Sequence, residues 1–187
     1  MSSSASAVPV EERDLVRRAL QGDRAAFDRL VERHYRRVYT LCLSLLGDAD
    51  EAEEATQEAF WRAYRHLRRY DPARSFRTWV LSIAAHHAID RLRRRPATAP
   101  WPEHLPAETP TPEEVLLRRE AQASIRRLVL QLPPVERALI LLRYWEGASY
   151  REMAEALGLS ESAVKSRLFR ARRALAQAFL AEEGTDA

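Results

Sequence analysis

The sequence predicts an all-α protein made of two small helical domains joined by a proline-rich linker. Three observations carry this prediction. Ala, Leu, Arg and Glu dominate the 187 residues and glycine is scarce, a composition that favours helices. Apolar residues recur every three to four positions through most of the chain, which is the spacing of an amphipathic helix. Six of the ten prolines fall between residues 96 and 112, where they exclude a helix or a central strand.

The prolines also set the domain boundary. Residues 1–10 show no apolar periodicity and predict a disordered tail, and residues 11–95 predict the first helical domain. The linker, residues 96–112, could span on the order of 50 Å in an extended polyproline conformation. Residues 113–187 predict the second domain.

Turn signals divide the first domain into helices. Gly22-Asp23 interrupts the first apolar stripe, and Gly47-Asp48 ends the second. The next stripe has acids in its first turns and bases in its last, as the helix dipole prefers. Tyr70-Asp71-Pro72 ends that helix, and a further helix runs to the arginines before residue 96. In the second domain, Pro133-Pro134 separates two more helical runs.

Residues 149–175, SYREMAEALGLSESAVKSRLFRARRAL, predict a helix-turn-helix. Ser149 and Glu152 have the spacing of a capping box, which starts a helix with its amide donors satisfied. Gly158 permits the left-handed backbone of a sharp turn, and Ser160 can cap the helix that follows. In such motifs the second helix enters the DNA major groove with its N-terminal half.

The outward side of this second helix carries hydroxyl groups and cations that can read base edges or hold phosphates. A solvated face in a helix bundle explains any one of these residues equally well, but the combination with the capping box and glycine turn favours DNA binding. The residues are Ser162, Lys165, Ser166, Arg167, Arg170, Arg172 and Arg173.

The helix from Asp48 to Tyr64 has an acidic outer face, which would repel DNA and suit a basic protein partner. Composition alone leaves a solvated helix as an alternative. The next turn, RHLRRYDPARSFRTW, interleaves arginines with aromatic residues, a pattern that suits single-stranded DNA. We expect Trp79 in the core, and Tyr70 and Phe76 exposed beside the Pro72 loop.

Several functions are not expected. The single cysteine, Cys42, cannot form an internal disulfide or a zinc knuckle. His86 and His87 point about 100° apart on a helix, so they do not make a metal site with Asp90. No catalytic grouping or phosphate-binding loop is recognisable, so we expect no enzyme activity, cofactor or small-molecule substrate. The N-terminus is no signal peptide and no apolar run could insert in a membrane, which predicts a cytoplasmic protein.

Three segments resemble the sigma-70 family of bacterial RNA polymerase sigma factors, in particular the extracytoplasmic-function (ECF) subfamily. They are GDADEAEEATQEAFWRAYRHL, SFRTWVLSIAAHHAIDRLRRR and LPPVERALILLRYWEGASYREMAEALGLSESAVKSRLFRARRAL. The resemblance implies that the first domain is sigma region 2 and the second is sigma region 4. It implies an alternative sigma factor that binds core polymerase and directs promoter-specific transcription initiation.

The resemblance also implies roles for individual residues. The acidic helix would bind the β′ clamp helices of the polymerase through Glu51, Glu54, Gln57 and Glu58. The loop after it would capture a flipped base of the −10 element as this element is melted. The next helix would contact the upstream edge and backbone. The implied −10 residues are Arg69, Tyr70, Arg74, Ser75, Phe76, Arg77, His86, Arg93 and Arg94. His86 departs from the family, which often has Asn there.

The second domain would bind the −35 major groove and dock on the polymerase β flap. Its implied −35 residues are Ser162, Lys165, Ser166, Arg167, Arg170 and Arg173. The resemblance further implies an anti-sigma factor as a partner. Two other classes remain open on the residues alone. One is a helix-turn-helix regulator whose other domain binds a ligand or dimerises, and the other is an enzyme acting on nucleic acid.

Overall fold

A computed structural model describes residues 10–72, 75–94, 125 and 127–183. Within these ranges the chain is helical and contains no strand, as the composition predicts. None of the described helices combines the length and apolarity that a membrane crossing requires. The predicted linker, residues 96–112, lies outside the described residues, as does the predicted tail up to residue 9.

The N-terminal half, residues 10–94, is built around α2. This long helix packs against α1, α3 and α4, and α3 and α4 also contact each other. The elements are α1 (Val10–Leu20), α2 (Arg24–Leu46), α3 (Ala49–Arg65), the 3-10 turn η1 (Leu67–Arg69) and α4 (Phe76–Arg94).

The breaks predicted at Gly22-Asp23 and Gly47-Asp48 are confirmed, whereas α3 ends at Arg65, before the predicted break at Tyr70-Asp71-Pro72. The Asp23 side chain accepts a hydrogen bond of 3.1 Å from the amide of Ala26, which caps α2. Gly47 ends α2 with φ of 76°, a left-handed conformation that glycine adopts without strain. Asp48 then caps α3 by accepting from the Glu51 amide at 2.9 Å.

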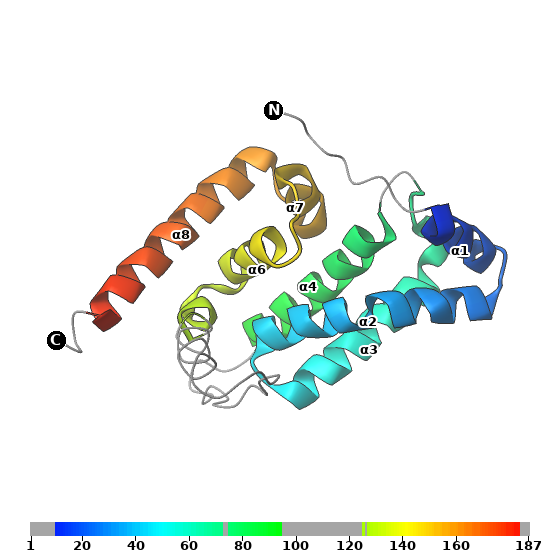
Figure 1. The fold of residues 1–187 in the computed structure, drawn as a ribbon, viewed down its shortest axis with the longest axis horizontal. Helices are drawn as coiled ribbons and strands as arrows, with labels where there is room; N and C mark the ends of the chain where they lie inside the picture. The colour runs from blue at the N-terminus through cyan, green and yellow to red at the C-terminus, as the bar shows by residue number, and fades with distance from the viewer. Residues whose placement is uncertain (1–9, 73–74, 95–124, 126, 184–187) are drawn as a thin grey trace, which may run out of the picture.

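The C-terminal half, residues 125–183, contains α6 (Pro134–Tyr144), α7 (Tyr150–Leu157) and α8 (Glu161–Glu183). Residues 127–131 are also helical and precede the Pro133-Pro134 break. Figure 1 shows α6 and α7 between α8 and α4, so α8 forms the outer side of this half.

The helix-turn-helix prediction is confirmed by the geometry of α7 and α8. The Ser149 hydroxyl accepts from the Glu152 amide at 3.2 Å, and the Glu152 carboxylate accepts from the Ser149 amide at 2.8 Å. Gly158 ends α7 with φ of 64°, and the Ser160 hydroxyl accepts from the Ala163 amide at 3.2 Å to cap α8.

The two halves pack against each other, which the sequence did not predict. Helix α4 contacts both α6 and α7, and α2 also contacts α6 (Figure 1). Buried apolar residues form one continuous core that extends from the N-terminal half into the C-terminal half. In this conformation the protein is one packed body.

Candidate DNA-binding and protein-binding surfaces

Helix α8 presents most of the predicted −35 residues to solvent. Its buried side consists of Val164, Leu168 and Ala171, which pack on α6 and α7. The exposed side carries hydroxyls and cations, which we call the basic α8 face. Its members are Ser162, Lys165, Ser166, Arg170 and Arg173.

Arg167 is an exception, and its expected outward position is wrong. Its Nη1 lies 2.7 Å from Oε1 of Glu136 in α6, and both side chains are partly buried. Arg167 lies three residues after Val164 and directly before Leu168, on the inner flank of the helix. It therefore ties α8 to α6 and does not extend the basic α8 face.

Tyr150 supports the start of this motif, a role that the sequence analysis missed. Its ring lies under two cations, with Nζ of Lys165 5.6 Å and Cζ of Arg143 5.2 Å from the ring centroid. Cations are attracted to the face of an aromatic ring. The contact therefore holds Lys165 near the start of α7 while leaving its side chain exposed.

A second surface of the C-terminal half is apolar, and the sequence analysis missed it as well. A groove of about 750 Å³ lies between α6 and α8. Tyr144, Trp145 and Phe169 line it, and each is more than half exposed. Arg172 and Arg173 lie at the same groove. Phe169 is the residue that could have indicated this groove in the sequence, because it is a large apolar residue outside the apolar stripe formed by Val164, Leu168 and Ala171.

The acidic α3 face, composed of Glu51, Glu54, Gln57 and Glu58, lies on the outer side of the N-terminal half. Glu54 and Gln57 are exposed, and Glu51 and Glu58 are partly exposed. Arginines of the same half neutralise part of it. Glu54 lies 2.9 Å from Arg91, and Glu58 lies 2.6 Å from Arg62.

Trp61 continues this face by one turn, although it was not among the predicted site residues. Its side chain is 52% exposed, on the side of α3 opposite the buried alanines. The guanidinium carbon of Arg65 lies 4.5 Å above the ring. A large aromatic group held flat against an arginine beside carboxylates is typical of a protein interface rather than of a solvated helix.

The prediction that Tyr70 and Phe76 are exposed is wrong. Phe76 is fully buried, with its ring centroid 5.8 Å from Trp79 and 5.6 Å from His34. It opens the apolar stripe of α4 that continues through Val80 and Ala84, and this position directs it into the core. Trp79 packs against the same core, as expected.

Tyr70 is 6% exposed and packs 5.0 Å from Trp79. Burial, aided by the negative charges of Glu12 and Asp71, raises the pKa of Tyr70 to about 12. Its remaining accessible edge lines a groove of about 680 Å³ against α1, with Arg13 and Arg17 on the opposite side. Stacking of a base on the full ring is excluded in this conformation.

The other predicted −10 residues are distributed around α4. Those exposed are Arg69, His86, Arg93 and Arg94, and those half-buried are Ser75 and Arg77; Arg74 lies outside the described residues. His86 Nδ1 lies 2.8 Å from the Ser82 carbonyl, so the ring is held against its own helix. These residues do not form one patch, because Arg77 lies where the two halves meet.

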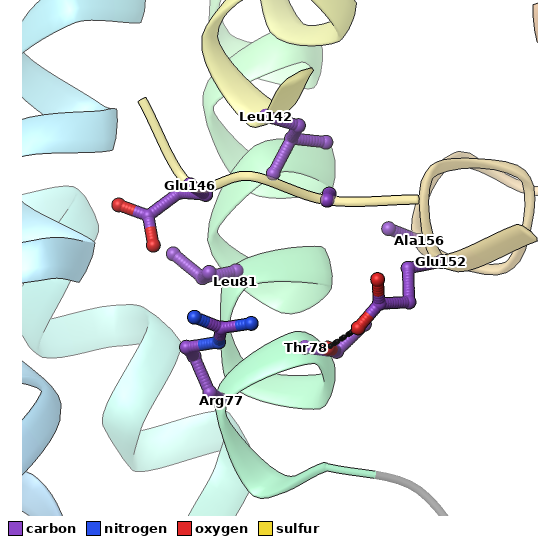
Figure 2. A pocket seen from close by; sticks show the side chains of 8 residues that line it. Arg77, Thr78, Leu81, Leu142, Glu146, Glu152 and Ala156 are labelled. Carbon is purple, nitrogen blue, oxygen red and sulfur yellow. Dashed lines mark hydrogen bonds between the residues drawn. The ribbon is translucent and has the colours of Figure 1, made fainter. Parts of the chain in front are cut away.

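Figure 2 shows this meeting point as a narrow pocket between α4 and the C-terminal half. Arg77, Thr78 and Leu81 form the α4 wall, and Glu146 and Glu152 face them with Leu142 and Ala156. The Thr78 hydroxyl donates a hydrogen bond to Glu152 at 3.3 Å.

The same interface contains a buried cation, Arg137 of α6, which is 3% exposed. Its guanidinium donates to the carbonyl of Leu45, in the last turn of α2, and to the carbonyls of Leu130 and Leu132 in its own half. Near the edge of the interface, Arg37 of α2 lies 3.2 Å from Glu146.

The described residues contain no cluster of three or more His, Cys, Asp or Glu side chains that could hold a metal ion. Cys42 is buried, and this burial raises the pKa of its thiol to about 11, so the thiolate form is disfavoured.

Comparison with known proteins identifies the family of the chain. The family model for sigma-70 region 2 matches residues 30–98, and the model for sigma-70 region 4 matches residues 122–175. The RNA polymerase sigma-H factor of Pseudomonas aeruginosa is 35% identical over 180 residues, covering 90% of this chain and 93% of that protein. The ECF sigma factor SigW of Bacillus subtilis is 33% identical over 172 residues, covering 86% and 92%.

Solved structures show the same fold. CnrH in complex with the cytosolic domain of CnrY matches with a TM-score of 0.70 at 27% identity, covering 91% of this chain and 98% of that chain. RpoE of Bartonella quintana, solved with the anti-sigma factor NepR, matches with a TM-score of 0.69 at 19% identity, covering 82% and 96%. With matching region 2 and region 4 models and close relatives over nearly its whole length, the chain belongs to the ECF group of sigma-70 family RNA polymerase sigma factors.

Proposed function

We propose that this protein is an alternative sigma factor whose three outer surfaces divide the work of promoter-specific initiation. The acidic α3 face binds core polymerase, the basic α8 face binds the −35 element, and α4 with the loop before it binds the −10 element. The observation that carries the proposal is the pairing of a capped helix-turn-helix bearing an exposed basic face with a separate acidic helix. A DNA-binding module alone has no use for the acidic helix.

The acidic α3 face suits the β′ clamp helices, because its carboxylates need a basic protein partner. We include Trp61 in this contact. Interfaces draw much of their binding energy from a few buried aromatic or arginine anchors surrounded by polar residues. Trp61, with Arg65 over its ring and Glu58 one turn earlier, has that composition.

The groove between α6 and α8 suits a protein partner with an apolar side chain flanked by acids, since Arg172 lines it together with Trp145 and Phe169. Exposed apolar surfaces of this kind mark sites of protein association. We assign this groove to the β flap, and an anti-sigma factor would compete for one or more of these surfaces.

In the N-terminal half, Arg69, Arg93 and Arg94 are placed to hold DNA phosphates, because all three are exposed. The flipped −10 base would enter beside Tyr70, in the groove that Arg13 and Arg17 share. Phe76 contributes from the core by holding the start of α4 and does not touch DNA.

Run-off transcription with purified core polymerase tests the proposal. The full chain should direct initiation from promoters that core polymerase alone does not use. A helix-turn-helix regulator would instead dimerise, bind a palindromic site without polymerase and support no initiation. That second outcome contradicts the proposal.

Charge reversal tests the polymerase contact. Glu54→Lys with Glu58→Lys should reduce retention of the protein by immobilised core polymerase. Asp28→Lys with Glu32→Lys is the matched control, because both are exposed acids on α2 outside the acidic α3 face and the change of charge is the same. Equal retention of the double variant and the control would refute the assignment of this face.

A further inference from the structure

Helix α1 borders the site that the proposed function assigns to the flipped −10 base, although none of the residues implied by the family resemblance lies on it. The segment that matches sigma-70 region 2 begins at residue 30, after α1 has ended at Leu20. Arginines and apolar residues recur every three to four positions along one side of this helix. That side borders the groove of about 680 Å³ beside Tyr70, whose other lining residues are Arg13, Val16, Arg17, Leu20, Gln21 and Pro72.

The groove has the chemistry to hold one nucleotide of a single DNA strand. Its apolar side chains suit the flat face of a base, and the amide of Gln21 offers both a donor and an acceptor to the edge of that base. Burial raises the pKa of Tyr70 and the charge of the exposed Arg13 acts against it, which places Arg13 near the phenol. Arg17 pairs with Asp14 at 2.5 Å, so Arg13 is the better placed of the two arginines to bind a phosphate.

A buried polar pair fixes α1 in place behind this groove. Oε2 of Glu12, on the inner side of α1, lies 3.1 Å from Nε2 of His34 in α2, and both side chains are buried. The His34 ring centroid lies 5.6 Å from that of Phe76, which in turn lies 5.8 Å from that of Tyr70. Contacts therefore run from the inner side of α1, through α2 and the start of α4, to the tyrosine that faces the groove.

The pair of Glu12 and His34 serves position more than stability. Buried charged pairs contribute little net stability compared with apolar residues of similar volume, but they can fix one arrangement of the groups around them. Nδ1 of His34 is buried and has no hydrogen-bond partner among the described residues. An unpaired polar atom of this kind is unfavourable in a protein core. What the pair holds in place therefore explains it better than the energy it contributes.

We propose that α1 and Gln21 form one wall of the −10 base site, in which Gln21 binds the edge of the captured base and Arg13 binds its phosphate. Glu12 and His34 act as positioning residues that hold this wall against Tyr70. This inference rests on the proposed function and adds residues that the family resemblance does not imply. The occupant is a nucleotide within a DNA strand, because the exposed arginines of α4 can hold the phosphates that flank it.

DNA strands with one base removed test the contact of Gln21. The probe is a single strand carrying the −10 element of a promoter that the holoenzyme, the chain with core polymerase, uses in run-off transcription. Abasic copies, altered at each position in turn, identify the captured base as the one whose removal weakens binding most. Gln21→Ala should weaken binding of the holoenzyme to the intact strand by at least about fivefold and leave binding to that abasic copy unchanged. Gln177→Ala, at an exposed position of α8, is the control.

Salt dependence tests the contact of Arg13. Arg13→Ala should weaken binding to the intact and the abasic strand alike, because the phosphate remains when the base is removed. It should also lower the slope of log affinity against log salt by about 0.7, the value for one phosphate of a single strand. Arg29→Ala, at an exposed position of α2 outside the groove, should leave the slope unchanged. An excess of the free deoxynucleoside monophosphate should not displace the strand, and displacement would assign the groove to a free nucleotide.

Glu12→Gln tests the positioning role, at a temperature where the variant is folded by circular dichroism. The ratio of its affinities for the intact and abasic strands should fall toward one, because the wall that meets the base is displaced. Cys42→Ala is the matched control, since it removes a buried group from the same core about two turns further along α2 than His34. Loss of stability alone leaves this ratio as it is in the unaltered chain.

The outcomes separate this inference from the proposed function. Failure of the unaltered holoenzyme to initiate, or equal binding of intact and all abasic strands, refutes the proposed function. If the unaltered holoenzyme captures a base and both Gln21→Ala and Arg13→Ala bind as it does, the α1 wall alone is refuted. An affinity ratio for Glu12→Gln equal to that for Cys42→Ala refutes the positioning role. Gln21 and Arg13 are exposed, so these two variants should fold whatever the effect of Glu12→Gln.

Discussion

Arg167 of α8 and Glu136 of α6 form an ion pair of 2.7 Å, so the recognition helix is fixed to the helix beneath it. Arg167→Ala should therefore lower the free energy of unfolding by about 1 kcal/mol, in the range of partly exposed ion pairs. The holoenzyme containing it should bind −35 DNA more weakly, with an unchanged dependence on salt. A reduced salt slope in a titration would mean that Arg167 contacts phosphate directly.

Lys165 and Arg170 should behave differently, because both are exposed on the basic α8 face. For a residue that neutralises one phosphate, replacement by alanine should lower the slope of log affinity against log salt by about 0.9. Binding of the holoenzyme to a −35 duplex at several salt concentrations measures this. Neither change should alter the midpoint of urea unfolding.

Gly158 should be required for its backbone conformation alone. Its φ is 64°, and a Cβ built there meets no atom within 4 Å. Gly158→Ala should thus lower the free energy of unfolding by about 1–2 kcal/mol through left-handed strain without a clash. Gly158→Asn should cost less, since Asn tolerates this region better. Urea unfolding of the two variants gives the comparison, and an equal cost would point to some other cause.

The buried pair of Glu12 and His34 should make the free energy of unfolding depend on pH in the acidic range. Oε2 of Glu12 lies 3.1 Å from Nε2 of His34, and both side chains are buried. The hydrogen bond to His34 lowers the pKa of Glu12 below its ordinary value of 4.5, against the opposing effect of burial. The contribution of Glu12 to the free energy of unfolding is therefore complete above about pH 4.5. It is lost as the pH falls through the lowered pKa that Glu12 has in the folded protein.

Glu12→Gln removes this titrating group. It should cost about 1–3 kcal/mol near neutral pH, as for other buried polar pairs that lose a charged partner. The difference in unfolding free energy between the variant and the unaltered chain should shrink below pH 4.5. A difference that stays constant from pH 7 to pH 3 would show that Glu12 acts through packing.

Trp61→Ala should weaken binding to core polymerase by about 2 kcal/mol, which corresponds to roughly thirtyfold. Because half of the side chain is exposed, its loss should have little effect on unfolding. Trp61→Phe should retain part of the affinity, since it keeps an aromatic anchor. If the variant binds polymerase normally but loses affinity for single-stranded −10 DNA, Trp61 contacts DNA and not polymerase.

Local features of this fold could be predicted from the sequence. Asp23, Gly47 and Gly158 mark helix ends because capping and positive φ depend on one or two residues and their immediate neighbours. The apolar stripes of α3 and α8 identify most of the buried residues in these helices, because the spacing of apolar residues is also a local property. The acidic α3 face is the side of this helix that its apolar stripe does not occupy.

Contacts between distant segments could not be predicted in this way. Phe76 has arginines and a proline nearby in sequence, which suggested exposure, yet its neighbours in space are Phe27, His34 and Trp79. By its local sequence, Arg137 is one more arginine on an amphipathic helix. Its burial depends on the end of α2, which is 92 residues earlier in the chain, and no local periodicity carries that information.

The apolar core that runs from α2 and α4 into α6 and α7 has a thermodynamic consequence for the protein by itself. Segments sharing one core melt together, so heating the isolated chain should produce a single calorimetric peak whose van't Hoff and calorimetric enthalpies agree. The heat needed to unfold one half then depends on the other, and a truncated chain comprising only one of them would expose apolar side chains that evolved to face a neighbour.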